Sequence, residues 1–101
     1  MANLDNPLGI FAESLYKDRT VLVTGGGRGI GKRIALAFAG LGASTVIARR
    51  NAENLDPTAE GIRSTGARCL PVVTNIREPE EVDNLMCSTL EEFGHIDFLV
   101  N

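Results

Sequence analysis

The sequence predicts an α/β fold built on a doubly wound, parallel sheet. Short apolar runs alternate with helical patterns along the 101 residues, and this alternation gives the order βαβαβαβ. Glycines occupy five of the seven positions 25–31, between the first apolar run and the first helical pattern, which is typical of the tight turn in a strand–turn–helix unit. We expect right-handed crossovers between the parallel strands and, for a doubly wound sheet, the strand order 3-2-1-4 in the part that these residues form.

The first half of the chain predicts two strands and one helix. Residues 20–24 form an apolar, β-branched run and predict the first strand. A helical pattern over about 30–41 is followed by Gly42, which is typical of a helix C-terminus. Residues 45–48 predict the second strand. The side chains expected on the apolar face of the helix are Ile30, Ile34, Ala37, Phe38 and Leu41.

The second helix and the third strand each contain a proline. Pro57 and Gly61 are both unfavourable inside a helix. Asp56 and Pro57 suit the N-cap and the first helical position, so we predict a short helix that starts near Pro57. The third strand, 69–73, contains Pro71, which lacks the N–H that a central strand needs and therefore indicates an edge strand.

The last predicted helix begins at a proline and ends before a glycine. Pro79 suits the first helical position, and the charges of Glu80 and Glu81 suit the first turn. Gly94 ends the helical pattern, and residues 97–100 predict the fourth strand. The side chains expected on the apolar face of this helix are Val82, Leu85, Met86, Thr89, Leu90 and Phe93.

The glycine-rich turn predicts a binding site for nucleotide phosphates, because glycines let the backbone and the first helical N–H groups approach an anion closely. The dinucleotide fingerprint G-x-G-x-x-G, begun at Gly25, meets Ile30 where its third glycine belongs. Begun at Gly27, it meets Lys32 there. The P-loop pattern G-x-x-x-x-G-K-[ST] fails at Arg33, where a hydroxyl should bind Mg²⁺. An ordinary βα turn without a ligand is the remaining alternative.

A further pattern, T-G-x-x-x-G-x-G, fits the turn throughout, with Thr24 and glycines at positions 25, 29 and 31. In this spacing the chain resembles the short-chain dehydrogenase/reductase family, which has a Rossmann-like fold. The run Asp-Phe-Leu-Val-Asn at 97–101 resembles the end of the family's fourth strand, which continues into Asn-Asn-Ala-Gly. Residues 75–82 also resemble the branch of the family that reduces enoyl-CoA and dienoyl-CoA thioesters. The resemblance covers residues 18–101.

The resemblance implies a cofactor site at this turn and at the ends of the neighbouring strands. In the family, an Asp after the third strand bonds to the adenine amino group. Asn75, followed by Ile76, stands at that position, and an amide can make the same bond. An Asx turn is the alternative role for Asn75. The cofactor-binding residues expected are Thr24, Gly25, Gly27, Arg28, Gly29, Ile30, Gly31, Arg49, Arg50, Asn75, Ile76 and Asn101.

The end of the second strand predicts NADP(H) as the cofactor. A carboxylate about 20 residues past the glycine turn selects NAD, whereas an arginine accommodates the 2′-phosphate of NADP. Arg49 stands in that position and Arg50 follows it, and we expect the fold to bring Arg28 near the same phosphate. The nearest downstream carboxylate, Glu53, comes too late in the chain. The alternative is that Arg49 and Arg50 are solvated charges at a strand end.

The resemblance implies that the catalytic groups lie outside these residues. The family uses a Tyr, a Lys four residues later and a Ser, all beyond the fourth strand. Tyr16 precedes the first strand and has Thr20 four places on. We therefore expect a lead-in segment, 1–17, and the N-terminal part of a dinucleotide-binding domain, 18–101, with no catalytic residue of its own. A parallel sheet that ended at its fourth strand would have a bare edge, so we expect the chain to be part of a longer protein.

Composition predicts a soluble protein, and the two cysteines favour a cytoplasmic one. Hydrophobic residues make up 44%, charged residues 23%, and the formal net charge is −3, which argues against a nucleic-acid partner. No apolar run approaches the roughly 20 residues that span a bilayer, so no membrane partner is expected. Cys69 and Cys87 have neither metal-site nor disulfide-framework spacing, and we expect both to be reduced and structural.

The function predicted is the cofactor-binding portion of an NADP(H)-dependent oxidoreductase. The resemblance implies hydride transfer between nicotinamide and a carbonyl, an alcohol or an enoyl thioester, a small-molecule substrate, and a homo-oligomer. A non-catalytic NADP(H)-binding or regulatory module is one alternative. A P-loop hydrolase is the other, and Arg33 argues against it.

Overall fold

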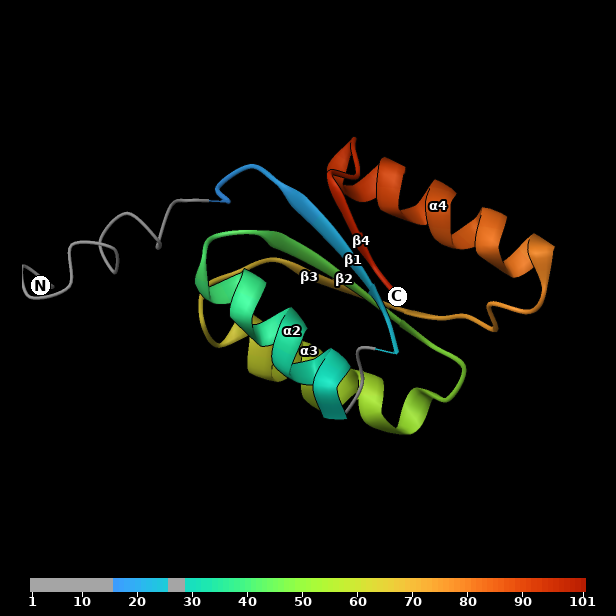
Figure 1. Ribbon diagram of the computed structural model, residues 1–101, viewed down its shortest axis with the longest axis horizontal. Coiled ribbons are helices and arrows are strands. Elements are labelled where there is room, and N and C mark those ends of the chain that lie inside the picture. The colour runs from blue at the N-terminus through green and yellow to red at the C-terminus, as the bar shows by residue number, and fades with distance from the viewer. Residues whose placement is uncertain (1–15, 26–28) are drawn as a thin grey trace, which may run out of the picture.

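Four parallel strands form one sheet in the computed structural model, which describes residues 16–25 and 29–101. The order is β3-β2-β1-β4, as the sequence predicts, and Figure 1 shows β1 between β2 and β4. The described strands are β1 (Thr20–Thr24), β2 (Ser44–Arg49), β3 (Cys69–Val73) and β4 (Phe98–Val100). All four predicted strands are therefore confirmed.

The helices cover both faces of the sheet, so the α/β doubly wound architecture is confirmed. Helices α2 (Gly29–Gly40) and α3 (Leu55–Arg63) lie on one face, and α4 (Pro79–Phe93) lies on the other (Figure 1). A short 3₁₀ helix, η1 (Ala52–Asn54), precedes α3. No helix in the described part of the chain has the length and apolar character needed to cross a membrane.

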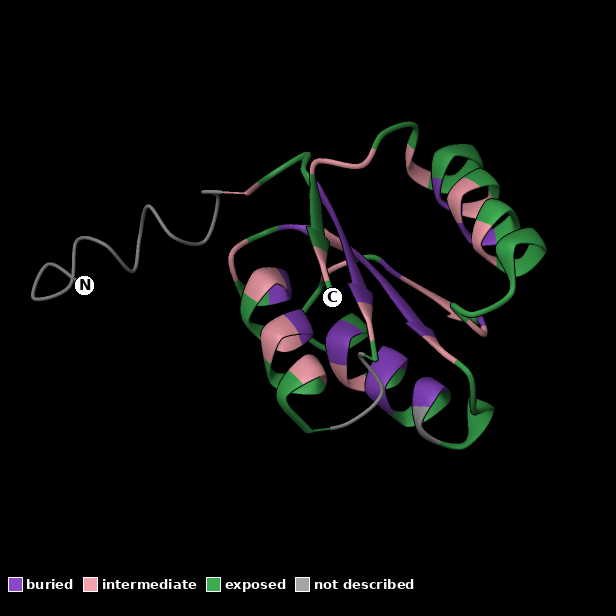
Figure 2. Cartoon of the chain, turned by 45° about the vertical axis from the view of Figure 1, so that its right-hand side comes forward, coloured by how far each residue is buried: buried purple, intermediate pink, exposed green. Residues whose placement is uncertain are grey.

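The central strands carry the core on both of their faces. Val21 and Val23 pack in the cluster on the side of α2 and α3, whereas Leu22 packs with Leu85 on the side of α4. Figure 2 shows buried residues along the central strands and on the side of α3 that faces them. A strand covered on both faces has a continuous apolar run rather than an alternating pattern, which is why Val21, Leu22 and Val23 follow one another in β1.

The face of α2 that packs on the sheet differs from the prediction. Ala35 and Ala39 are the buried residues of α2, and neither was expected there. Ile30 is 77% exposed, and Ala37 is exposed as well. Small side chains four positions apart let the helix backbone approach the sheet closely, and the larger side chain of Phe38 then packs at the margin of the contact. Ile34 and Leu41 are half-buried.

Helix α3 begins at Leu55, two residues before the predicted start, and the prediction of Asp56 as its N-cap is wrong. The chain turns helical at η1, where the Asn51 Oδ1 accepts a hydrogen bond of 3.1 Å from the Glu53 N–H. Pro57 lies in the first turn of α3, where a backbone N–H has no carbonyl partner one turn earlier in the helix. The missing donor of Pro57 is therefore harmless at this position.

Helix α4 starts at Pro79 and ends at Phe93, directly before Gly94, as predicted. Gly94 has a φ of 84°, a left-handed conformation that favours glycine at a helix end. Leu85 and Thr89 are buried, and the Thr89 hydroxyl donates to the Leu85 carbonyl oxygen at 2.8 Å. Leu90, expected on the apolar face, is 49% exposed. It lies about 140° around the helix from Leu85, outside the buried stripe.

Pro71 lies in an edge strand, as predicted. In the described sheet β3 pairs with β2 alone, with Pro71 opposite Ile47. The proline therefore sits where one side of the strand has no hydrogen-bonding partner within the sheet.

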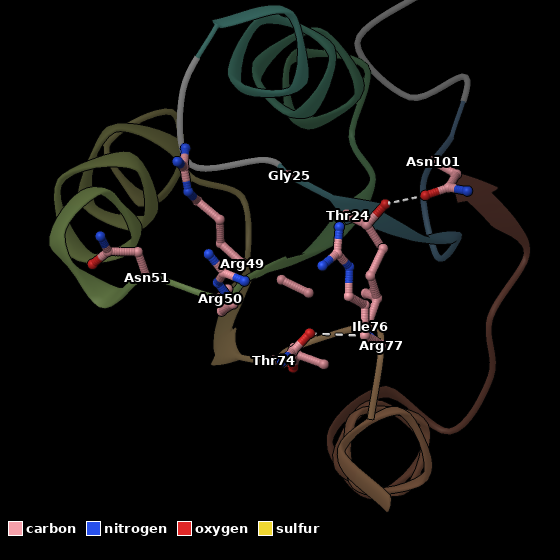
Figure 3. Close-up of a pocket in the computed structure, with 11 residues that line it drawn as sticks. Thr24, Gly25, Arg49, Arg50, Asn51, Thr74, Ile76, Arg77 and Asn101 are labelled. Atoms are coloured by element: carbon pink, nitrogen blue, oxygen red, sulfur yellow. Dashed lines mark hydrogen bonds between the residues drawn. The ribbon is translucent and has the colours of Figure 1, made fainter. Parts of the chain in front are cut away.

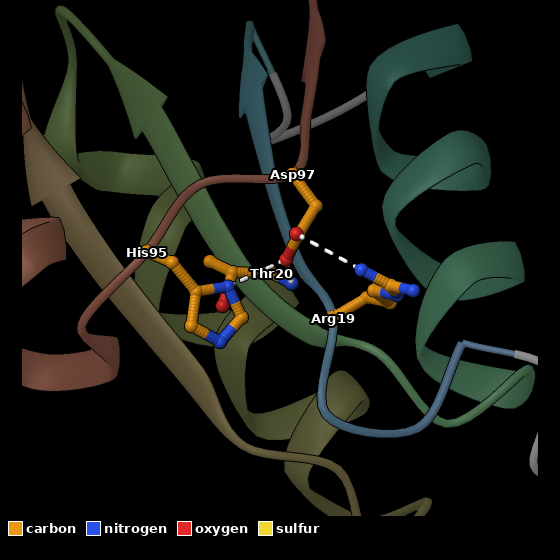
Figure 4. Close-up of polar contacts among 4 residues, drawn as sticks. All are labelled: Arg19, Thr20, His95 and Asp97. Atoms are coloured by element: carbon orange, nitrogen blue, oxygen red, sulfur yellow. Dashed lines mark hydrogen bonds and ion pairs between the residues drawn. The ribbon is translucent and has the colours of Figure 1, made fainter.

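A polar cluster joins the starts of β1 and β4 (Figure 4). The Thr20 N–H donates to the Asp97 Oδ2 at 2.8 Å, across 77 positions of sequence. Nδ1 of His95 lies 2.6 Å from the same oxygen, and an Arg19 nitrogen lies 3.4 Å from the Asp97 Oδ1. The Thr20 hydrogen bond is the main reason that the pKa of Asp97 lies below its ordinary value, and His95 and Arg19 act in the same direction.

Acidification is expected to weaken the fold through Asp97. A lowered pKa in the folded state means that the ionised carboxylate stabilises the fold above its unfolded pKa of about 4, and that this stabilisation is lost as the pH falls through the folded pKa. We expect Asp97→Asn to lower the urea midpoint at neutral pH and to reduce the further loss below about pH 4. The measurement is a series of urea unfolding curves against pH. Exposed Glu91→Gln is the control, and identical pH profiles for Asp97→Asn and the unmodified protein would exclude this role.

The two cysteines differ in exposure. Cys69 is buried, and burial raises the pKa of its thiol to about 11, although the Arg63 charge acts in the opposite direction. Cys87 is exposed, which contradicts the expectation of two structural cysteines in apolar surroundings. Cys87 lies on the solvent side of α4, midway in sequence between Leu85 and Thr89, which are buried.

Thiol labelling is expected to separate the two cysteines. The thiolate is the reactive form, so a buried thiol with a raised pKa reacts slowly. We expect a maleimide at about pH 8, near the ordinary thiol pKa, to modify Cys87 in the folded protein and Cys69 only after unfolding in urea. Peptide mass spectrometry identifies the labelled site. Equal labelling of both thiols before unfolding would contradict the buried position of Cys69.

Candidate functional site

A cleft of about 630 Å³ opens at the carboxyl ends of β1, β2 and β3 (Figure 3). In open α/β sheets this edge is where ligands bind, because the loops that follow parallel strands gather there. Predicted cofactor-binding residues that line the cleft are Thr24, Gly25, Arg49, Arg50, Asn75, Ile76 and Asn101. Residues that line it without having been predicted are Ala48, Asn51, Thr74 and Arg77.

Three further predicted residues lie away from the cleft. Gly29, Ile30 and Gly31 form the first residues of α2 and do not line the cleft. Gly27 and Arg28 lie outside the described residues, so the expected approach of Arg28 to the same phosphate stays a prediction.

The end of β1 is tied to its neighbours on both sides. The Thr24 hydroxyl donates to the Asn101 Oδ1 at 2.7 Å, which joins the carboxyl ends of β1 and β4. The Gly25 N–H donates to the Ala48 carbonyl oxygen at 2.7 Å, which continues the pairing with β2. Gly25 then leaves the strand with a φ of 71°, and a residue with a Cβ rarely adopts that conformation. The β1 side of the cleft is therefore formed by a strand end that hydrogen bonds fix on both sides and by a turn that requires glycine at position 25.

Arginines give the cleft its charge. Arg49 is the last residue of β2 and half-buried, and Arg50 is exposed directly after it. The Thr74 N–H donates to the Arg49 carbonyl oxygen at 2.7 Å, which fixes the backbone at this point. Among the described residues, no Asp or Glu lines the cleft, and no ion pair engages Arg49, Arg50 or Arg77. Uncompensated guanidinium groups of this kind suit an anionic ligand, above all a phosphate.

The loop after β3 forms an Asx turn. The Arg77 N–H donates to the Asn75 Oδ1 at 3.0 Å, and the Asn75 N–H donates to the Glu81 Oε1 at 2.9 Å. The turn presents Ile76, which is 55% exposed, at the cleft. The alternative role of Asn75, as a turn former, is thus present in the structure, whereas adenine recognition by its amide stays a prediction.

Among the lining residues that were not predicted, Arg77 matters most chemically, because it is charged. An Asx turn at Asn75 places the second following residue beside the strand ends, so the position of Arg77 two residues after Asn75 could have indicated its place. A charged residue in a loop has no periodic pattern, so only the turn could have located it.

Comparison with known proteins yields a consistent set of relatives. The family model described as short chain dehydrogenase matches residues 19–101. The chain is 42% identical over 93 residues to the peroxisomal 2,4-dienoyl-CoA reductase of Danio rerio, an alignment that covers 91% of this chain and 31% of that protein. It is 46% identical over 94 residues to the probable 2,4-dienoyl-CoA reductase 3 of Caenorhabditis elegans, covering 91% and 30% respectively.

Solved structures show the same similarity. The citronellol catabolism dehydrogenase AtuB of Pseudomonas aeruginosa PAO1 superposes with a TM-score of 0.85 at 42% identity, over 91% of this chain and 38% of that one. The hydroxysteroid dehydrogenase of Escherichia coli gives a TM-score of 0.82 at 31% identity, over 85% and 37%. The chain spans about a third of the length of the curated relatives it matches.

Proposed function

The chain belongs to the short-chain dehydrogenase/reductase family, and from that premise we propose that it forms the cofactor-binding part of an NADP(H)-dependent oxidoreductase. When bound, the dinucleotide supplies a hydride donor or acceptor at its nicotinamide ring. The residues of this chain bind and orient the dinucleotide. The groups that donate and accept protons at the substrate are expected in the remainder of the parent protein.

The observation that carries the choice of NADP(H) is Arg49 at the end of β2 in a cleft that no described carboxylate lines. A carboxylate at this place would bond to the adenosine ribose and repel a 2′-phosphate. Arg49 and Arg50 instead offer planar donor groups that can bond to two phosphate oxygens at once.

The cleft also fits the remainder of a dinucleotide. Gly25 has no side chain and leaves β1 with a φ of 71°, and no neighbouring atom lies within 4 Å of where a Cβ would be, so the space beside its backbone is open. The backbone can therefore approach a diphosphate closely. The hydrogen bond between Thr24 and Asn101 holds the carboxyl ends of two adjacent strands together at the side of the cleft.

The proposed substrate class is an enoyl thioester. The support is that relatives over 40% identical to this chain are named 2,4-dienoyl-CoA reductases, in Danio rerio and Caenorhabditis elegans. A carbonyl or alcohol substrate is the broader alternative within the same reaction type. The substrate and a homo-oligomeric assembly belong to the whole protein, and assays on the protein from its native source test both.

The first test is to titrate the native protein with NADPH and NADH and to measure its intact subunit mass. We expect NADPH to bind at least about tenfold more tightly, the scale of one charge-assisted contact. We also expect a mass well above 10.8 kDa, the mass of these residues. Tighter binding of NADH would refute the NADP(H) assignment. A subunit mass of 10.8 kDa would leave a binding module without the family's catalysis.

The proposed compartment of the protein is the cytoplasm. The support is that both cysteines are free, as is usual where thiols are kept reduced. Relatives in Danio rerio and Mus musculus are named as peroxisomal, so the compartment needs a direct measurement. Fractionation of source cells with an antibody against the native protein decides it, and recovery with peroxisomes would overturn the cytoplasmic assignment.

A further inference from the structure

We propose that Arg77 is a third cationic contact for the cofactor and binds its diphosphate, the part that NADPH and NADH share. This inference rests on the proposed function, because it concerns the same cleft. It adds a residue that acts on affinity for both cofactors, separate from Arg49 and Arg50, which select between them.

Arg77 reaches the cleft from the side opposite the other two arginines. Arg49 and Arg50 lie at the end of β2, whereas Arg77 lies in the loop between β3 and α4. Figure 3 shows the Arg77 side chain extending from that loop toward Thr24. Thr24 is the last residue of β1 and stands directly before the glycine-rich turn. The guanidinium of Arg77 thus lies toward the start of the turn that approaches the phosphates, rather than at the end of β2.

The loop holds Arg77 in this position without help from a ligand. The Arg77 N–H donates to the Asn75 Oδ1 at 3.0 Å. The Glu78 N–H donates to the Asn75 carbonyl oxygen at 3.0 Å, and the Glu81 Oε1 accepts from the Asn75 N–H at 2.9 Å. Three hydrogen bonds therefore converge on Asn75 and fix the backbone from which Arg77 extends. A side chain that starts from a fixed backbone loses less entropy when it binds.

The charge of Arg77 has no ion-pair partner within the described chain. Glu81, in the first turn of α4, accepts a backbone hydrogen bond from Asn75 instead. Three arginines in one cleft repel one another, and an anion between them relieves that repulsion. A 2′-phosphate at the end of β2 accounts for Arg49 and Arg50. The diphosphate accounts for the third cation, on the side of β1.

The test compares cofactor affinities of variants of the native full-length protein by calorimetric titration. We expect Arg77→Gln to raise the Kd of NADPH and of NADH by a similar factor, about tenfold or more, the scale of one charged hydrogen bond. ADP contains the diphosphate that the two cofactors share, and its Kd should rise by the same factor. Arg50→Ala should raise the Kd of NADPH alone. Arg77→Lys, which keeps the charge and loses the planar group, should recover part of the affinity for all three ligands.

Lys17→Gln is the matched control, because Lys17 is an exposed cation that precedes β1, at the end of the strand away from the cleft. It should leave every Kd unchanged. Unchanged Kd values for Arg77→Gln would overturn the inference while leaving the proposed function intact. A loss confined to NADPH would also overturn it, since Arg77 would then act at the 2′-phosphate. Absence of binding by the unmodified protein would overturn the proposed function and the inference together.

Discussion

Replacement of Arg49 by Asp together with Arg50 by Ala is expected to reverse the cofactor preference of the native protein. Each charge-assisted hydrogen bond to a phosphate contributes about 1.5–3 kcal/mol, so the loss of two such bonds should raise the Kd of NADPH by about 100-fold or more. The new carboxylate at the end of β2 can accept a hydrogen bond from the ribose hydroxyl of NADH, which should improve the affinity for that cofactor. Titration of both cofactors against the variant measures the change.

The matched control keeps the charge at both positions. Arg49→Lys with Arg50→Lys should retain the preference for NADPH and lose part of the affinity, because an ammonium group cannot bond to a phosphate through two parallel donors. If the Asp and Ala substitutions left the ratio of the two affinities unchanged, the end of β2 would not be where the 2′-phosphate is recognised.

Leu22→Ala is expected to cause the largest loss of stability among the substitutions considered. Leu22 lies in the central strand β1, has no exposed surface, and packs in the cluster that Leu85 joins from α4. Removal of a fully buried leucine side chain lowers the free energy of unfolding by about 2–5 kcal/mol, through lost transfer energy and the cavity that remains. Chemical denaturation of the full-length protein, followed by circular dichroism, measures this loss.

Leu90→Ala is the control for that experiment. Leu90 is 49% exposed on the outer side of α4, so the same chemical change removes less buried surface there. We expect a loss below about 1 kcal/mol. Equal losses at positions 22 and 90 would mean that Leu90 is covered on α4 as fully as Leu22 is covered between the sheet and α4.

The strands and their order were predictable because the sequence encodes them in apolar runs. Buried parallel strands require continuous apolar residues, and Pro71 could lie only at an edge. The face of α2 was not predictable in the same way, since Ala35 and Ala39 carry a weak hydrophobic signal and yet are the buried residues of the helix. The start of α3 was misplaced because a proline is tolerated throughout the first helical turn, so Pro57 marks that turn only approximately.

The candidate site was predictable where it follows strands and less so where it follows loops. The positions of Arg49 and Asn75 follow from the ends of β2 and β3. The place of Arg77 depends on an Asx turn, and the partner of Asp97 is a backbone N–H 77 positions away. Contacts of these two kinds depend on the three-dimensional arrangement of the chain, so no periodic pattern in the sequence predicts them.

The central position of β1 determines the order in which the sheet can assemble. β1 is made before both of its neighbours, and it pairs with β2 across about 24 residues but with β4 across about 77. The entropy lost on closing the longer loop is greater by about 1 kcal/mol. We therefore expect the pair β1–β2 to form first and β4 to dock later, with the carboxylate of Asp97 meeting Thr20 at that step. A substitution that weakens this late contact is then expected to speed unfolding and to have much less effect on the folding rate.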